Sequence, residues 1–273
     1  MTPVPPVIVL DGVERRFPSG TRALAACSLA IGRGEFVTLL GPSGCGKSTL
    51  LRMIAGLDRP SAGTIRVDAG AGEGPPARAR SQAAAGISFV FQEPTLMPWA
   101  TVFDNVWLPR RLAGETREAA RADVEAVLGR VGLEAFAQAW PRELSGGMRM
   151  RVSIARALVS RPRVLLMDEP FAALDEITRE RLNDDLLDWC RSLSLTTVFV
   201  THSVFEAVYL SERVLVMSPR PGRLTAEVVI DAPYPRGERF RGATRYAQVC
   251  AEVSRTLRAA ERDGDGAIPG VAS

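Results

Sequence analysis

The sequence predicts an α/β fold whose sheet is mostly parallel. Two observations carry this prediction: short continuous apolar runs occur along the chain, and they alternate with longer segments whose apolar residues recur at helical spacing. Continuous apolar runs of this length are typical of strands buried on both faces, as in a parallel sheet covered by helices. The four runs are Phe36–Leu40, Val164–Met167, Val198–Val200 and Val214–Met217.

The helical segments lie mostly between the first and second of these runs. Apolar residues recur at helical spacing from Val124 onward, and a further helix is predicted from about 146 to 160. We therefore expect residues from about 93 to 160 to form a mainly helical lobe inserted into the sheet domain. Another helix is expected over about 179–193, where core packing explains the apolar stripe.

The same patterns predict how the chain is organised. A single domain is expected over 7–262, followed by a flexible tail over 263–273. The stretch 69–86 is rich in Gly, Ala, Pro and Arg, which is typical of a mobile surface loop. Beyond Ile230 the sequence predicts one helix and the tail.

Composition excludes several classes of protein. The chain has 273 residues, of which 46% are apolar and 24% charged, as in an ordinary soluble domain. The net charge of +3 is small and the arginines are scattered, so no nucleic-acid partner is expected. No apolar run approaches the roughly 18 residues of a spanning helix, and residues 1–12 do not resemble a signal peptide. We therefore expect the chain to stay in the cytosol.

The cysteines do not form a recognisable framework. They stand at positions 27, 45, 190 and 250, without a CxxC pair and with only one histidine in the chain. Reduced and mostly buried thiols are expected. Cys45 lies within a glycine-rich loop, where a redox role is one interpretation and a small space-filling side chain is the favoured one.

The only lysine of the chain lies in this glycine-rich loop, residues 41–49, which read Gly-Pro-Ser-Gly-Cys-Gly-Lys-Ser-Thr. Gly41 and Gly46 allow backbone N–H groups to face phosphate oxygens, and the following helix offers its positive N-terminal end to the same anion. Lys47 can reach the β- and γ-phosphates as a compact charge, and Ser48 can coordinate magnesium. The predicted nucleotide-binding residues here are Gly41, Pro42, Ser43, Gly44, Cys45, Gly46, Lys47, Ser48 and Thr49.

Two adjacent carboxylates follow the second apolar run. Adjacent acids are common on protein surfaces, but these come directly after a predicted buried strand in a chain that also has the phosphate loop. Successive residues at a strand end point in different directions, so the two groups can take different roles. We expect Asp168 to hold magnesium and Glu169 to activate the attacking water.

Further motifs decide the family. Gln92 follows a predicted strand, Ser145-Gly146-Gly147 opens a predicted helix, Asp175 comes shortly after the acids, and His202 is the only histidine. Each of these residues alone would be an ordinary loop residue, helix start or strand end. In this order, with the phosphate loop and the acids, they make the sequence resemble the nucleotide-binding subunits of ABC transporters, from Val7 to about Arg258.

The resemblance implies a fold, an activity and roles for single residues. The implied fold is a P-loop NTPase core of the RecA type with a mostly parallel sheet, a small antiparallel β subdomain and an inserted helical subdomain. The implied activity is ATP hydrolysis with Mg²⁺, in a pair of ATPase subunits that enclose two ATP molecules. Phe17 would stack on adenine, Gln92 would sense magnesium and water, and His202 would hold the γ-phosphate. Asp175 would link the two sites, and Ser145, Gly146 and Gly147 would complete the ATP site of the opposite subunit, although Met148 stands where glutamine is frequent.

Within this family, several segments resemble import ATPases for nitrate, aliphatic sulfonates, taurine and thiamine precursors. The segments are Gln92–Trp99, Val102–Val106, Thr201–Ser211 and Met217–Gly222. The resemblance implies integral membrane permease subunits as partners, a periplasmic or extracellular solute-binding protein as an indirect partner, and a peripheral place on the cytoplasmic face of the cell membrane. The transported solute does not touch such a subunit.

Alternatives remain at two points. A chromosome or repair ATPase is disfavoured because the stretch from Lys47 to Leu144 has no room for a long coiled coil, whereas an ABC ATPase that transmits force in a non-transport membrane complex shares every motif. Leu96, Met97 and Trp99 lie beside Gln92 on a stretch whose prolines exclude a helix. They predict either packing between the lobe and the sheet or, as we favour, the edge of a groove for a permease helix.

Overall fold

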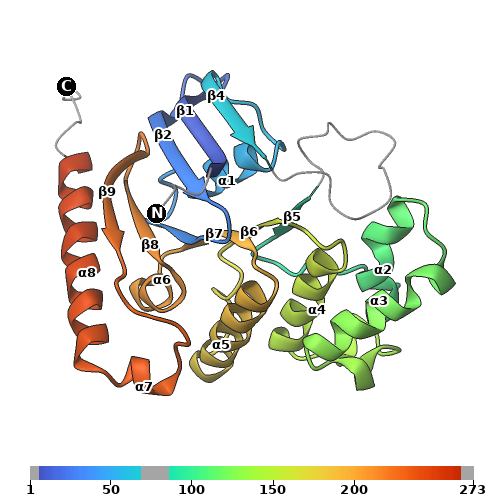
Figure 1. Ribbon diagram of the computed structural model, residues 1–273. Helices are drawn as coiled ribbons and strands as arrows, with labels where there is room; N and C mark the ends of the chain where they lie inside the picture. The colour runs from blue at the N-terminus through green and yellow to red at the C-terminus, as the bar shows by residue number, and fades with distance from the viewer. Residues whose placement is uncertain (1–5, 69–85, 266–273) are drawn as a thin grey trace. The chain divides into compact units, whose positions relative to one another are not determined.

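The computed structural model describes residues 6–68 and 86–265 (Figure 1). The chain divides into two compact units. One, the terminal unit, consists of Met1–Val67 and Val198–Ser273, and the other, the central unit, consists of Asp68–Thr197. Residues 69–85 of the expected surface loop and residues 266–273 of the expected tail lie outside the described residues.

A small antiparallel sheet forms the first part of the terminal unit, which confirms the expected β subdomain. Its strand order is β2-β1-β4, and both pairs are antiparallel. A Cβ at Gly63 would lie 2.3 Å from the carbonyl oxygen of Gly12, so only glycine fits where β4 crosses β1. The bounds are β1 Pro6–Arg16, β2 Arg22–Gly32 and β4 Ala62–Val67.

The second sheet of the terminal unit contains three of the four predicted apolar runs. Its order is β7-β3-β8-β9, where β3 pairs parallel with β8 and β9 is an antiparallel edge. Every residue of β3 is buried, as expected for a strand covered on both faces. The bounds are β3 Phe36–Leu40, β7 Thr196–Thr201, β8 Arg213–Ser218 and β9 Arg223–Val229, so β7 starts in the central unit and continues into the terminal unit.

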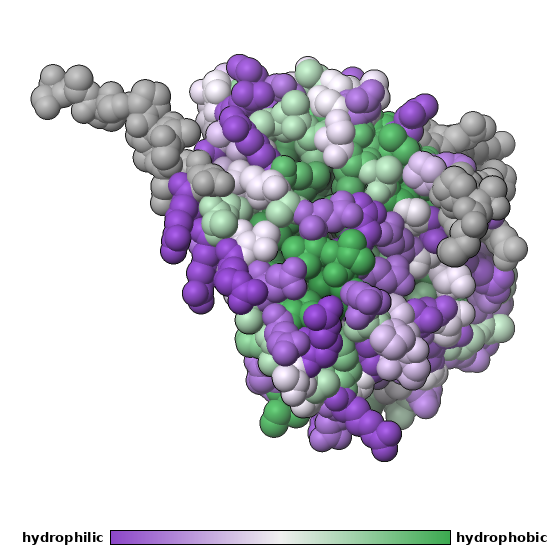
Figure 2. All heavy atoms as spheres, turned by 60° about the vertical axis from the view of Figure 1, so that its left-hand side comes forward, coloured by the Kyte–Doolittle hydropathy of each residue, from purple (hydrophilic) through white to green (hydrophobic). Residues whose placement is uncertain are grey.

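Four helices accompany these strands. The long helix α8 packs against β8, and its side chains Tyr246, Val249 and Val253 are buried. Hydrophilic side chains line the outer side of α8 (Figure 2). The expectation of one helix after Ile230 was wrong, because a short helix, α7, precedes α8. It forms a single turn between Gly237 and Gly242, which are its N-cap and C-cap. The bounds are α1 Lys47–Ile54, α6 Val204–Leu210, α7 Glu238–Arg241 and α8 Thr244–Asp265.

In its described residues the central unit combines a parallel strand pair with four longer helices, three of which the sequence predicts individually and the fourth of which, α2, lies in the predicted helical lobe. Strand β5 pairs parallel with β6. The helices begin where an oxygen side chain accepts a backbone N–H, at Thr101, Thr116, Ser145 and Asp175. The last of these caps sets the start of α5 three residues before the expected position 179. The bounds are β5 Ile87–Val90, α2 Val102–Leu112, α3 Arg117–Arg130, α4 Gly146–Leu158, β6 Val164–Asp168 and α5 Glu176–Ser192, with 3-10 turns at Glu134–Phe136 and Pro141–Glu143.

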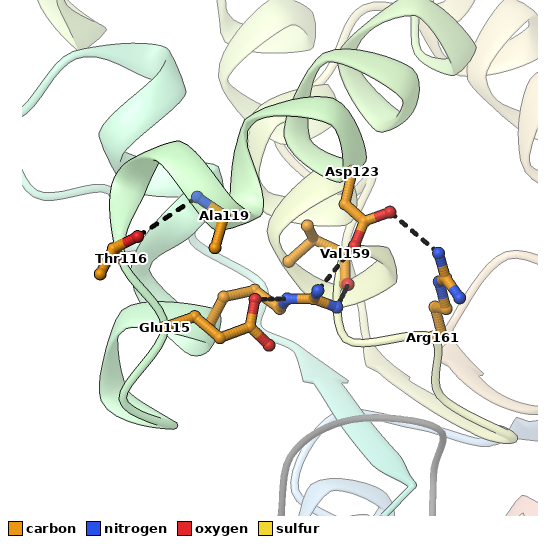
Figure 3. Close-up of polar contacts among 7 residues, drawn as sticks. Glu115, Thr116, Ala119, Asp123, Val159 and Arg161 are labelled. Atoms are coloured by element: carbon orange, nitrogen blue, oxygen red, sulfur yellow. Dashed lines mark hydrogen bonds and ion pairs between the residues drawn. The ribbon is translucent and has the colours of Figure 1, made fainter.

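A nearly buried arginine ties three of these helices together (Figure 3). Arg110 of α2 donates hydrogen bonds to Glu115 at 2.7 Å, to Asp123 of α3 at 2.6 Å and to the carbonyl of Val159 after α4 at 3.4 Å. Arg161 also donates to Asp123 at 2.9 Å. Because an unpaired charge in such a place is costly, the network fixes how α2, α3 and α4 pack within the central unit.

Candidate nucleotide site

The phosphate loop of the terminal unit joins the end of β3 to the start of α1. Gly44 and Gly46 adopt positive φ angles of 75° and 100°, and Gly46 is the N-cap of α1 without a side-chain cap. The Lys47 side chain is buried and donates hydrogen bonds to the carbonyls of Gly41 at 2.8 Å and Pro42 at 2.9 Å. Its ammonium therefore lies on the inner side of the loop, at the helix N-terminus that favours an anion.

Close packing leaves no space for side chains at two loop glycines. A Cβ at Gly41 would lie 2.8 Å from the carbonyl oxygen of Met217 and 2.9 Å from the Cys45 sulfur, and one at Gly46 would lie 2.9 Å from the carbonyl of Ala23. The Cys45 side chain is itself buried, which fits a space-filling role. The loop conformation thus depends on glycine at these positions.

Sequence reasoning missed a residue that supports this loop from behind. Gly222 exchanges backbone hydrogen bonds with Ala23 at 3.0 Å and Ala25 at 2.9 Å, and a Cβ on it would lie 1.9 Å from the carbonyl oxygen of Cys45. Arg220 donates to the carbonyl of Gly44 at 3.4 Å. The sequence signal for Gly222 was the turn Pro-Arg-Pro-Gly at residues 219–222, but in the sequence alone this turn indicated only the import branch.

Two other expected residues of the terminal unit are accessible. The Phe17 ring, in the turn after β1, is 37% exposed, and the Arg15 guanidinium lies 5.1 Å from its centroid. His202 follows β7 and is exposed. Beside it, Thr201 donates a short hydrogen bond to Glu206 and accepts one from the Ser203 amide at 3.0 Å, which fixes the turn into α6.

The two carboxylates lie at the end of β6 in the central unit. Asp168 is the last strand residue, and both acids are partly exposed. Glu169 has a φ of 45°, an unusual conformation for a residue other than glycine, and its carbonyl accepts from Ala172 at 3.2 Å. Strained backbone of this kind is common at functional sites, and here it stands at the start of the turn from Glu169 to Ala172.

The Ser145 segment lies beside the Asp175 segment within the central unit. Ser145 is exposed and accepts from the Met148 amide at 3.2 Å, as expected for the cap of α4. Gly147 is buried. A Cβ there would lie 2.6 Å from the Thr178 methyl group of α5, so the close packing of the two helices requires glycine at this position. The Thr178 backbone N–H also donates to Asp175 at 3.0 Å, and this hydrogen bond lowers the pKa of the Asp175 carboxyl.

Gln92 is exposed and begins a segment without helix or strand, and the two prolines had predicted the absence of a helix. Trp99 is 74% exposed in this segment, whereas Leu96 and Met97 are half-buried. Two side chains that sequence reasoning missed hold its backbone: Arg156 and Asn105. Arg156 is about sixty residues away along the chain, and no signal in its local sequence marked it. Asn105 lies in the segment Val102–Val106, which in the sequence indicated only the import branch.

The expected magnesium ligands are divided between the units. Ser48 belongs to the terminal unit, and Gln92 and Asp168 belong to the central unit. Hydroxyl, amide and carboxylate oxygens suit Mg²⁺, which binds few protein groups and keeps several waters. The donor types at these positions therefore fit the ion. Across residues 6–68 and 86–265, no group of three or more His, Cys, Asp and Glu side chains is placed to hold a metal.

Comparisons with known proteins agree on one family. The ABC transporter family model matches residues 24–172. The aliphatic sulfonates import ATP-binding protein SsuB 1 of Rhizobium johnstonii is 45% identical over 232 residues, covering 85% of this chain and 80% of that protein. An uncharacterized ABC transporter ATP-binding protein of Methanocaldococcus jannaschii is 47% identical over 215 residues, covering 79% of this chain and 78% of the relative.

Solved structures give the same result. CbiO1 of Clostridium perfringens, part of an ABC transporter complex, matches with a TM-score of 0.74 at 27% identity, covering 93% of this chain and 98% of that one. A dimeric ATP-binding cassette bound to ADP and phosphate matches with a TM-score of 0.69 at 31% identity, covering 83% of this chain and all of that one. In the part of the chain that the structure describes, no helix is long and apolar enough to cross a membrane.

Proposed function

Because this chain belongs to the ABC transporter family and is an ABC-type ATPase, we propose that it drives the import of a small solute, in the first place an aliphatic sulfonate. The observation that carries the proposal is the 45% identity, over 85% of the chain, to a sulfonate import ATP-binding protein. Nitrate and taurine are the related solutes to which the same sequence segments point.

The residues of the terminal unit would bind the nucleotide. The amides of the phosphate loop and the N-terminus of α1 would accept the phosphates, with the Lys47 ammonium moving from the carbonyls of Gly41 and Pro42 to the β- and γ-phosphate oxygens. The exposed Phe17 ring would stack on the adenine, and His202 would hold the γ-phosphate. The buried position of the Lys47 side chain supports this role, because an ammonium there contacts anions with little competition from water.

The residues of the central unit, with Ser48 of the terminal unit, would carry out the hydrolysis. Asp168, Ser48 and Gln92 would hold Mg²⁺, which supplies charge neutralisation for the phosphates when bound. Glu169 would take the proton of the attacking water, and Gln92 would orient that water. The strained backbone at Glu169 supports its catalytic role, since such conformations cluster at active sites.

Two copies of the chain would form the active ATPase. Ser145, Gly146 and Gly147, at the start of α4, would complete the ATP site of the partner subunit, with Ser145 and Gly147 contacting its γ-phosphate, and Asp175 would connect the two sites. The similarity to a dimeric cassette bound to ADP and phosphate supports this arrangement. The tight contact between Gly147 and Thr178 would keep the Ser145 segment and the Asp175 segment together in each subunit.

The membrane partners would be permease subunits, reached at the Gln92–Trp99 segment from the cytoplasmic face of the membrane. Trp99 is 74% exposed, which supports a docking role, because an exposed large aromatic ring is more useful at an interface than in solvent. Leu96 and Met97 are half-buried and so would serve both packing and docking. A solute-binding protein would deliver the solute to the other side of the permease.

Glu169→Gln tests the ATPase part of this proposal. The variant should bind ATP as the wild type does but lose hydrolysis by about 10³-fold, the range expected for removal of a general base. With ATP and magnesium it should accumulate as a dimer in size-exclusion chromatography. Glu134→Gln, which alters an exposed carboxylate of the same unit, is the matched control and should hydrolyse ATP normally.

The transport part of the proposed function is tested in cells that carry the same two variants. Uptake of a radiolabelled alkanesulfonate should stop in cells whose only copy carries Glu169→Gln and continue with Glu134→Gln. Sulfonate uptake that persists with Glu169→Gln while nitrate or taurine uptake stops would reassign the solute. Unchanged hydrolysis by Glu169→Gln would contradict the assignment of the general base.

A further inference from the structure

The segment from Gln92 to Ala100 has no regular backbone structure, yet side chains from two helices fix its backbone. Arg156 of α4 donates to the carbonyl of Thr95 at 2.8 Å, to the carbonyl of Pro94 at 2.7 Å and to the Thr95 hydroxyl at 3.0 Å. Burial lowers the pKa of the Arg156 guanidinium. A planar guanidinium that bonds two successive carbonyls fixes both the position and the direction of that backbone.

Asn105 of α2 holds the other end of the segment. Its amide oxygen accepts from the Met97 N–H at 2.7 Å, and its amide nitrogen donates to the carbonyls of Met97 at 3.2 Å and Ala100 at 3.1 Å. The Asn105 side chain is completely buried. The two ends of the segment are therefore attached to different helices, the Pro94–Thr95 end to α4 and the Met97–Ala100 end to α2.

The backbone at the Arg156 contact is strained. Thr95 has a φ of 47°, a left-handed conformation that a β-branched residue rarely adopts. Such a conformation persists only where the surrounding contacts determine it, and the three hydrogen bonds from Arg156 are those contacts. Loss of the guanidinium would let the segment relax, and Gln92 lies only three residues from Thr95.

We propose that Arg156 is a positioning residue that makes the Gln92 segment follow the movements of helix α4. The inference rests on the proposed function, in which Ser145 contacts the partner's nucleotide and Gln92 contacts magnesium and water. Ser145 caps the start of α4, and Arg156 stands eleven residues later in the same helix, about 16 Å along its axis. Because a helix of this length moves as a rigid body, binding of nucleotide at Ser145 displaces the backbone that carries Gln92.

Arg151 provides a matched control on the same helix. It is also half-buried, donates to the carbonyl of Val131 at 2.9 Å and to the carboxylate of Asp185, and lies against the Trp189 ring. None of these partners belongs to the Gln92 segment. Arg151→Gln therefore removes a comparable set of contacts from α4 without releasing Pro94 and Thr95.

Hydrogen exchange in the full-length chain tests the inference. Each arginine variant is made in the Glu169→Gln background, and exchange of the Thr95 and Leu96 amides, at the Arg156 end of the segment, is followed by mass spectrometry before and after ATP with magnesium produces the dimer. With Arg156 present, dimer formation should slow exchange in the segment by about 10-fold or more. Arg156→Gln should abolish this response, and Arg151→Gln should retain it.

A second readout uses chains with Glu169 intact. Arg156→Gln should lower kcat by about 10-fold while the Kd for ATP stays within about twofold, because only the catalytic geometry is released. Arg156→Lys should give an intermediate kcat, since an ammonium can bond one carbonyl but cannot span two, and it serves if the glutamine variant does not fold.

The outcomes separate the inference from the proposed function. If ATP produces no dimer and the wild type hydrolyses no ATP, the proposed function is wrong. If the dimer forms but exchange in the segment responds equally with and without Arg156, the positioning role of Arg156 is overturned while the ATPase assignment stands. Equal losses of kcat in Arg156→Gln and Arg151→Gln would also overturn the positioning role, because they would show that Arg156 only stabilises helix α4.

Discussion

The phosphate loop and the Gln92 segment are both irregular, but different parts of the chain determine their shapes. In the phosphate loop, glycines adopt positive φ angles and pack against backbone atoms, and Lys47 bonds carbonyls only five and six residues away. In the Gln92 segment, the backbone is held by Asn105 and by Arg156, which is about sixty residues away. A loop of the first kind has a fixed shape before any partner binds, whereas a loop of the second kind moves with the helices that hold it.

The largest effect is expected from a substitution that disturbs the backbone support of the phosphate loop. Gly222→Ala would place a Cβ 1.9 Å from the carbonyl oxygen of Cys45, so the loop must shift. Overpacking of this kind costs about 3 kcal/mol, and we expect ATP affinity to fall by about 100-fold in isothermal titration calorimetry. Gly237→Ala is the control, because a Cβ there meets no atom within 4 Å. Wild-type affinity in Gly222→Ala would show that the loop tolerates the shift.

An intermediate effect follows from removing a side chain that shapes the other loop. Asn105→Leu keeps the volume but leaves the Met97 N–H and several carbonyls without their buried partner. We expect the free energy of unfolding to fall by about 2 kcal/mol in urea denaturation, with ATP affinity nearly unchanged. Asn183→Leu is the control and should lower the free energy of unfolding by less. The amide oxygen of this buried asparagine has no hydrogen-bond partner within the described chain. Equal losses in the two variants would mean that burial alone, without the segment contacts, explains the cost.

The smallest expected effect concerns the strain itself. Thr95→Gly relieves the left-handed conformation but loses the hydroxyl contact with Arg156 and adds backbone freedom in the unfolded state. These terms oppose each other, so the free energy of unfolding should change by no more than about 1 kcal/mol, measured by thermal denaturation. Thr95→Ser keeps the hydroxyl and separates the two contributions. A loss well above 2 kcal/mol in Thr95→Gly would show that the threonine side chain, rather than Arg156, holds the segment.

The contrast between the loops also explains how far the sequence could predict this molecule. Buried strands were predictable because a short, continuous apolar run such as Phe36–Leu40 is typical of a strand covered on both faces, and β3 spans those residues. The phosphate loop and the acids after β6 were predictable as local motifs because their chemistry needs neighbouring residues. Cap positions were partly predictable: Ser145 was expected to start a helix, whereas Asp175 was assigned only its family role, which is why the start of α5 was placed too late.

Long-range support could not be read from the sequence. Gly222 looks like an ordinary turn glycine, and its contact with the Cys45 carbonyl appears only when β8 and β9 fold beside the phosphate loop. Arg156 lies among many arginines, and nothing in its neighbourhood distinguishes it from Arg151. Side chains that act on a distant backbone carry no local pattern, so their roles depend on tertiary structure.

The division of the chain into two units also has a spectroscopic consequence. All four tryptophans, at positions 99, 107, 140 and 189, belong to the central unit. Trp99 is 74% exposed and Trp140 is 38% exposed, whereas Trp189 is nearly buried. Intrinsic tryptophan emission therefore reports on the central unit alone. Trp99 lies on the proposed permease-facing segment, three residues from Leu96, so a change in its emission would report docking without an added label.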